Sequence, residues 1–371
     1  MPQQLEWYHP GLQGVVAGET EICSLADGLL YRGYCIHELA EQASFLEVAH
    51  LLLHERLPNA EELADFNSLI CEAAALPSLV AGLLEQMPMH AAPVDVLRTG
   101  LSLLTHDDPQ FDDGGDLAGV SKAVTLIARF PLPACVWHRA KQNWEPFEWS
   151  SDESYAANLF RGLTNRSPHP HEEQALDSAL VVSMEQEFNP ATFAARIVGS
   201  NNGDLYCAVL AGLAVHGGRR HSGDYDTILQ LLRSGMGGVK SLLADRERVV
   251  PGFGHPVFVD CDPRASILEN WTSQLAMRPG VRSFEAMAEE IEHAVWEARK
   301  LPPNLDWAFA RLLHYMGLPS ELHLPVFLCA RCVGWCAHAL EQSLSGVVIR
   351  PRARYRGALA AEFEPLAHRD G

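Results

Sequence analysis

Apolar side chains recur every three or four residues over most of the chain, which is the spacing of one face of an α-helix. Convincing strands are scarce, and only the glycine-rich segment 11–36 favours turns or a small hairpin. We therefore expect an all-α fold. The pattern predicts helices over 37–57, 61–76, 93–104, 117–130, 154–164, from about 172, within 193–214, and over 225–235, 283–300, 304–316 and 323–342.

Local signals set some of these boundaries. Pro58-Asn59 is expected to end the first helix, and Asn59 with Glu62 has the spacing of a capping box for the next. Ser283 is a candidate N-cap for the helix over 283–300. Residues 139–153 are polar and predict a connection.

Size and composition indicate a large globular protein. With 371 residues, 47% of them hydrophobic, the chain can bury an extensive core and form two domains. We expect no membrane span, since no apolar run is long enough, and no signal sequence opens the chain. Nine cysteines without a regular framework suggest a reducing compartment, so we expect a cytoplasmic protein.

The charge of the chain limits its partners. A net charge of −19 argues against a general nucleic-acid binder, because phosphate backbones are held by clustered lysine and arginine. The tail carries Arg350, Arg352, Arg354 and Arg356, for which substrate or interface roles fit the acidic chain better than a nucleic-acid patch. Where a few arginines converge, an anionic ligand can still bind.

The segment Val250-Pro-Gly-Phe-Gly-His255 has the clearest chemical content. Gly252 and Gly254 allow a sharp turn that presents His255, and Asp262-Pro263-Arg264 follows shortly after. A histidine and a fixed cation can therefore share one pocket wall. For an isolated Gly-His pair, a solvated surface loop would be the simpler interpretation.

Separated pieces of the chain resemble one family in the right order. They are LLYRGY ending at Tyr34, VHGG at His216, the PGFGH…DPR segment, and NLD at Asp306 followed by AR-x-VGW at Arg331. The chain is identified on these motifs as similar to the citrate synthase family. The resemblance implies a helical homodimer with a large domain over 1–217 and 318–371, and a smaller domain over 218–317 that closes over the substrates.

The resemblance also implies residue roles. Asp306 would be the base that removes the proton beside a thioester carbonyl, and His216 would donate to the thioester oxygen. His255 would donate to the oxo group of the acceptor. Arg264 and Arg331 would bind its anionic groups, and Arg350 would reach across the dimer interface into the partner's active site.

Each role has a structural alternative. Asp306 could instead cap the helix that starts there, and a buried histidine is more often a core residue than a catalyst. Arg331 is harder to explain structurally, because an unpaired charge inside an apolar helix is costly. The cysteines 329, 332 and 336 could bind zinc or take part in redox chemistry, but small core residues are the better interpretation, since no second C-x-x-C or histidine pair completes a ligand set.

The chain departs from the family at several positions. Gln186 stands where the family's string has an acceptor-contacting histidine, and it cannot titrate. Arg219-Arg220-His221 replace Ala-Asn-Glu after the glycine pair, which makes Arg219 and Arg220 candidates for substrate binding. Residues 256–260, Pro-Val-Phe-Val-Asp, replace basic residues that would help hold CoA phosphates.

These observations predict an acyltransferase that condenses acetyl-CoA with a 2-oxo acid resembling oxaloacetate and hydrolyses the thioester. Acetyl-CoA is a co-substrate, and no cofactor or metal is expected. Propionyl-CoA as the acyl donor and phosphonopyruvate as the acceptor are open alternatives. A non-catalytic protein that binds an acid or CoA is the competing class.

Overall fold

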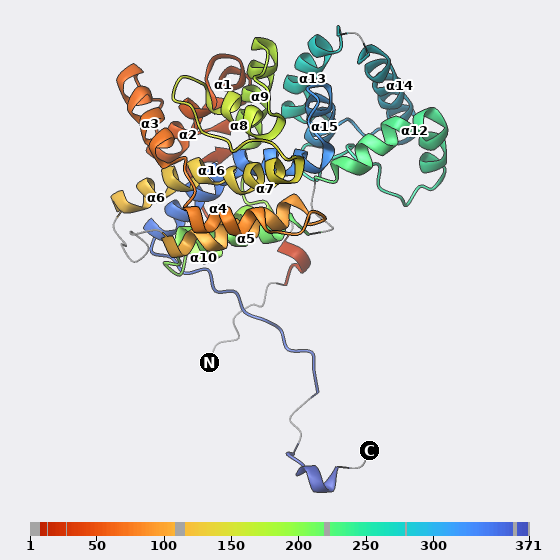
Figure 1. Ribbon diagram of the computed structural model, residues 1–371. Helices are drawn as coiled ribbons and strands as arrows, with labels where there is room; N and C mark the ends of the chain where they lie inside the picture. Colours follow the sequence, from red (N-terminus) through yellow and green to blue (C-terminus); the bar gives the residue numbers. More distant parts are fainter. Residues whose placement is uncertain are drawn as a thin grey trace.

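The computed structural model describes residues 8–12, 14–26, 28–107, 116–218, 223–278, 280–358 and 362–369. Within them the regular secondary structure is almost entirely helical (Figure 1), so the expected all-α class is confirmed. The hairpin predicted near the N-terminus is a three-stranded antiparallel sheet of β1 (Cys23–Ser24), β2 (Leu30–Tyr31) and β3 (Tyr34–Cys35). Short 3-10 turns are η1 (Pro10–Leu12), η2 (Thr105–Asp107), η3 (Ser320–Leu322) and η4 (Leu366–His368).

The first half of the chain forms helices largely where the pattern predicted them. They are α1 (Ile36–Gln42), α2 (Phe45–His54), α3 (Ala60–Ala73), α4 (Ser78–Glu85), α5 (Pro93–Leu104), α6 (Asp116–Arg129), α7 (Leu132–Gln142) and α8 (Tyr155–Thr164). The capping box at Asn59 is confirmed. The single helix expected from residue 37 is wrong, because Ser44 and Glu47 form a second capping box that starts α2.

The second half contains α9 (Pro170–Ser183), α10 (Pro190–Gly199), α11 (Leu205–His216), α12 (Tyr225–Ala244), α13 (Pro263–Leu275), α14 (Arg282–Arg299), α15 (Leu305–Tyr315) and α16 (His323–Leu344). Helix α12 continues beyond the predicted end, with Gly235 at a φ of 60° inside it. The proposed cap Ser283 is wrong, since it lies inside α14, whose N-cap is Val281 and has no side-chain cap bond.

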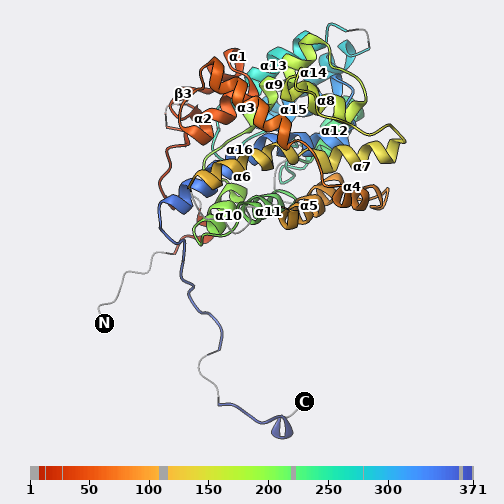
Figure 2. The ribbon, with the colours of Figure 1, turned by 60° about the vertical axis from the view of Figure 1, so that its left-hand side comes forward.

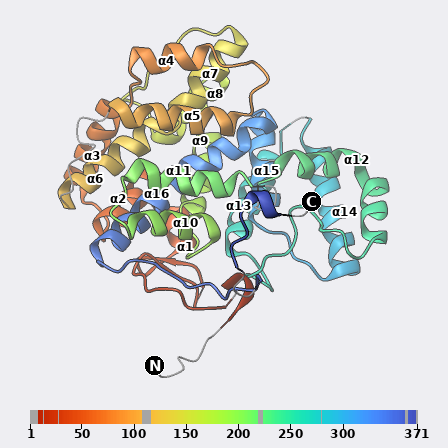
Figure 3. The same ribbon diagram turned by 90° about the horizontal axis from the view of Figure 1, so that it is seen from below.

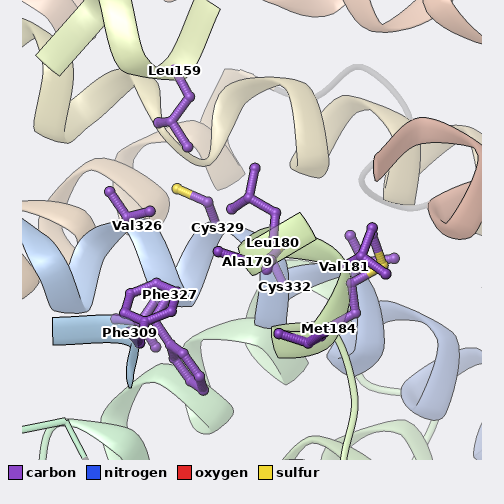
Figure 4. Packing of buried hydrophobic residues seen from close by; sticks show 14 of the residues in the cluster. Leu159, Ala179, Leu180, Val181, Met184, Phe309, Val326, Phe327, Cys329 and Cys332 are labelled. Atoms are coloured by element: carbon purple, nitrogen blue, oxygen red, sulfur yellow. The ribbon is translucent and has the colours of Figure 1, made fainter. Parts of the chain in front are cut away.

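Helix α16 forms the centre of the protein. It lies against α6, α9, α10 and α11, as the three ribbon views agree (Figure 1, Figure 2 and Figure 3). Cys329 and Cys332 pack among apolar side chains of this core (Figure 4), and Cys336 is buried as well. Their predicted packing role is confirmed. Among the described residues, no three His, Cys, Asp or Glu side chains are placed to hold a metal ion.

Two helical stretches are long and apolar enough to cross a membrane, judged by length and composition alone. They are Gly119–Gln142 and Ser320–Leu344, and a third candidate is the bent pair α3 and α4. The expectation that no apolar run is long enough is therefore wrong. Isolated charged residues interrupt these helices, so their apolar character does not show as one continuous run. In the most apolar part of each stretch, 67% of Gly119–Gln142 and 94% of Ser320–Leu344 is buried inside the protein. Packing in the core therefore accounts for their apolar composition.

Helices α12 and α14 lie at one edge of the molecule, away from α2 and α3 (Figure 1 and Figure 3). A buried carboxylate ties this side to the main body. Glu172 of α9 accepts from Arg166 Nη1 at 2.8 Å and from Arg278 Nη1, just after α13, at 2.6 Å. After Ile349, whose backbone N–H donates to the Ser200 hydroxyl at 3.2 Å, the chain leaves the body as an extended tail (Figure 1 and Figure 2).

Candidate active site

Asp306 lies in the first turn of α15, where Asn304 caps the helix. The Asn304 side chain accepts from the backbone N–H of Asp306 at 3.0 Å, so the cap belongs to Asn304 and the carboxylate of Asp306 is free for other contacts. That carboxylate accepts from the backbone N–H of Gly223 at 3.1 Å and from the Tyr225 hydroxyl at 3.3 Å. Burial raises the pKa of Asp306 to about 6, in the range of a general base at neutral pH.

His216 ends α11 on the same side of this cluster. The residue is 4% exposed, and its ring lies 5.2 Å from the ring of Phe327. A β-carbon added to Gly223 would lie 3.9 Å from His216 Cε1. The backbone at Gly223 therefore borders both Asp306 and His216, which brings the two predicted residues to one place.

The loop that presents His255 is fixed to the segment before α15. Gly254 donates its backbone N–H to Pro302 O at 2.8 Å, and the Asn304 side chain donates to Gly254 O at 2.9 Å. Gly252 has a φ of 83°, and a β-carbon there would approach Trp307 to 3.0 Å. Glycine is needed for this turn, which joins the His255 loop to the helix that carries Asp306.

Arg264 is held by Asp262, the N-cap of α13. The guanidinium donates to both oxygens of Asp262, through Nε at 2.9 Å and Nη2 at 2.8 Å. Burial on its own would raise the pKa of Asp262, but the Arg264 charge outweighs it and holds that pKa below its usual range. The remaining nitrogen, Nη1, donates to Gln186 Oε1 at 2.9 Å.

Arg331 lies in α16 with its guanidinium 5.0 Å above the ring of Phe327. The residue is 2% exposed, and within the described part of the chain its Nε and Nη1 have no hydrogen-bond partner. An uncompensated guanidinium in this setting is costly, so the site is suited to an anion that supplies the missing acceptors. Phe327 lies beside both Arg331 and His216, which joins these residues to the same cluster.

The structure thus brings together most of the residues singled out in the sequence: Gln186, His216, His255, Arg264, Asp306 and Arg331. Arg350 is exposed at the start of the tail that runs away from the body, so a single chain does not bring it to the cluster. Arg219 and Arg220 lie outside the described residues.

Sequence reasoning missed several members of the cluster. Asp262 and Asn304 had a usable signal, since each is an Asp or Asn directly before a helix start and belongs to a quoted motif. Tyr225 and Gly223 had none, because their contact with Asp306 crosses about eighty positions of sequence.

A helical fold that gathers a carboxylate, two histidines and two arginines in one largely buried cluster defines an acid–base enzyme acting on a small anion. The family model for the citrate synthase C-terminal domain matches residues 11–352. A citrate/2-methylcitrate synthase of Bacillus subtilis is 35% identical over 364 residues, covering 96% of this chain and 98% of the relative. A 2-methylcitrate synthase of Shewanella oneidensis is 32% identical over 370 residues, covering 97% of each chain.

Solved structures show the same likeness. The citrate synthase of Thermotoga maritima has a TM-score of 0.87 and 28% identity, covering 98% of this chain and 100% of that one. The chain belongs to the citrate synthase family. It is therefore an enzyme and an acyltransferase, and this family uses no cofactor.

Proposed function

We propose that the protein condenses an acyl-CoA with oxaloacetate and hydrolyses the resulting thioester. The observation that carries this is the pairing of a base with an anion site. Asp306, with its raised pKa, lies in one cluster with Arg264 and with the buried, partly unpaired guanidinium of Arg331. The family match over residues 11–352 supports this reaction.

In the proposed mechanism Asp306 takes a proton from the carbon beside the thioester carbonyl, and His216 donates to the enolate oxygen that forms. The enolate carbon then attacks the oxo carbon of the acceptor, whose oxygen becomes an alkoxide beside His255 and later takes a proton. Arg264 and Arg331 hold the carboxylates. Water finally cleaves the thioester, releasing CoA and a tricarboxylic acid.

The acyl group is acetyl or propionyl in this proposal. Relatives named as citrate synthases and as 2-methylcitrate synthases match at closely similar identity, 35% and 32% in the two cases above, so the likeness does not separate them. The enzyme would act in the cytoplasm as a homodimer, with residues 218–317 closing over the substrates as a small domain. Arg350 would enter the partner's site, and Arg219 and Arg220 would contact substrate.

The test is a thiol-release assay on the purified protein. Acetyl-CoA and propionyl-CoA are each combined with oxaloacetate, pyruvate, 2-oxoglutarate and phosphonopyruvate. We expect release with oxaloacetate, and the ratio of kcat/KM values for the two thioesters assigns the acyl group. Thiol release with phosphonopyruvate and not with oxaloacetate would identify phosphonopyruvate as the acceptor. No release in any combination would refute the proposal.

A further inference from the structure

The side-chain amide of Gln186 lies between two cluster residues. Its Oε1 accepts from Arg264 Nη1 at 2.9 Å, and its Nε2 lies 2.8 Å from His255 Nε2. Gln186 follows α9 directly, and its backbone N–H donates to Glu185 Oε1 at 2.7 Å, which fixes the start of its side chain. The amide therefore contacts an arginine and a histidine at once.

The proton on His255 can be placed from its other ring nitrogen. Nδ1 lies 3.1 Å from the backbone nitrogens of both Val257 and Phe258. Each of these groups can only donate, so Nδ1 accepts and carries no proton. Burial, together with the Arg264 charge, lowers the pKa of His255 to about 4, so the ring is neutral at pH 7 with its proton on Nε2.

It follows that two donors face each other. The Nε2–H of His255 points at the NH₂ group of Gln186, and neither can accept from the other. Turning the amide over does not help, because its NH₂ group would then face Arg264 Nη1, which is also a donor. One amide oxygen cannot serve both neighbours, so an acceptor atom is missing between Gln186 and His255.

We propose that the oxo oxygen of the acceptor is this atom, so that Gln186 and His255 together hold the alkoxide formed in the condensation. This deepens the proposed function and rests on it. Gln186 would then be a catalytic hydrogen-bond donor, where the family's string has a titratable histidine. For both nitrogens to reach one oxygen at hydrogen-bond distance, they must separate to about 4–5 Å, which rotation of the Gln186 side chain allows.

In this arrangement Gln186 contacts the reacting carbonyl of the acceptor and not one of its carboxylates. Charge on that oxygen grows only as the carbon–carbon bond forms and the carbonyl electron pair moves onto oxygen. A donor placed there stabilises the transition state more than bound oxaloacetate, so its loss lowers kcat. A donor to a carboxylate would instead contribute to binding in both states and would change mainly KM.

The decisive variant is Gln186→Glu. Its carboxylate can accept from Arg264 with one oxygen and from His255 with the other, which removes the donor–donor contact. We expect this variant to have a higher Tm than the wild type in the absence of substrate. We also expect a kcat at least about 100-fold lower, because an acceptor now faces the developing alkoxide. A residue with only a structural role would not change stability and turnover in opposite directions.

A second variant, Gln186→Met, removes the donor without adding charge, and Gln274→Met makes the same change at an exposed position of α13 as the control. Oxaloacetate turnover and succinate binding are both measured, since succinate has the two carboxylates but a methylene in place of the oxo group. We expect Gln186→Met to lower kcat about 100- to 1000-fold while succinate affinity changes less than about threefold. The control should match the wild type.

Several results would overturn this inference. Loss of succinate affinity in parallel with turnover would place Gln186 on a carboxylate. An unchanged kcat in Gln186→Met, or a lower Tm in Gln186→Glu, would also refute it. If Gln186→Met fails to fold, the opposed Tm and kcat shifts of Gln186→Glu still decide. A wild-type enzyme that releases no thiol would refute the proposed function, whereas an active wild type with normal variants refutes only the role of Gln186.

Discussion

Two aspartates near Arg264 show how environment separates residues of the same type. Asp262 makes two short contacts with the guanidinium and is held ionised, so it serves to position Arg264. Within the described part of the chain, the donors to Asp306 are an amide and a hydroxyl, and burial raises its pKa to about 6. We therefore propose that Asp306 is the proton-accepting carboxylate of this cluster.

The first prediction concerns the pH dependence that Asp306 confers. The base acts when ionised, so kcat/KM should rise with pH through about 6 and level off above it. Asp306→Asn should lower kcat about 100- to 10,000-fold at pH 7.5, while the exposed Asp152→Asn, outside the cluster, stays near the wild type. Steady-state kinetics from pH 5 to 8 provide the measurement. A wild-type profile that is flat below pH 7, or normal turnover in Asp306→Asn, would remove Asp306 from the mechanism.

The sequence motifs predicted most of the residues that form the cluster, namely His216, His255, Arg264, Asp306 and Arg331. What they could not give was the partner of each side chain. The pairing of Gln186 with His255 depends on how α9 meets the loop before α13, which no local pattern encodes.

Among the elements, helices with a clear apolar face or a cap were predicted closely, as α5 over 93–104 illustrates. Three helices were missed, α4, α7 and α13, and the last two share a common reason. Helix α7 buries His138 and Arg139, and α13 buries Arg264 and Thr272, so polar residues occupy the inner face and interrupt the apolar period. In α13 the buried Arg264 belongs to the candidate site, so a functional residue occupies a position where the helix pattern calls for an apolar one.

The second prediction concerns the N-terminus of α13. Asp262 accepts from the Arg264 backbone and side chain and from the backbone N–H of Leu305, so it joins α13 to α15. Asp262→Ala would leave the Arg264 guanidinium buried without its partner, and should lower the free energy of unfolding by about 3–5 kcal/mol at pH 7. Urea unfolding measures this change, with the exposed Asp260→Ala as the control.

The same contact gives a pH signature. Because the pKa of Asp262 is below its usual value of 3.8 in the folded protein, its contribution is complete well above pH 3.8 and is lost as pH falls through the lower, folded-state pKa. The difference between Asp262→Ala and the wild type should therefore shrink toward pH 3. A difference under about 1 kcal/mol at pH 7 would show that the pair is not what holds α13, since it would then contribute no more than an exposed ion pair, for which about 1 kcal/mol is the upper end.

For the whole molecule, the family likeness predicted the helical architecture, but a single chain leaves its tail unexplained. Beyond α16 the tail runs out from the body and carries exposed apolar side chains, among them Tyr355 and Phe363 at 78% and 83% exposure. Apolar groups displayed along an extended segment are suited to a surface on another chain. Arg350 lies in this tail, which is consistent with the proposal that it completes the site of a partner.

The last prediction tests whether the active site is shared between subunits. Arg350→Ala and His255→Ala chains carrying different tags are co-expressed, and the dimers that hold both tags are isolated. If Arg350 serves the partner's site, one site of each mixed dimer keeps both residues and the other lacks both. These dimers should then have about half the activity of the wild type, although each parent is inactive. The control pairs His255→Ala with Asp306→Asn, which act in the same subunit, so every mixed site lacks one residue and activity stays lost. Mixed dimers of the first pair that are as inactive as this control would show that Arg350 does not cross the interface.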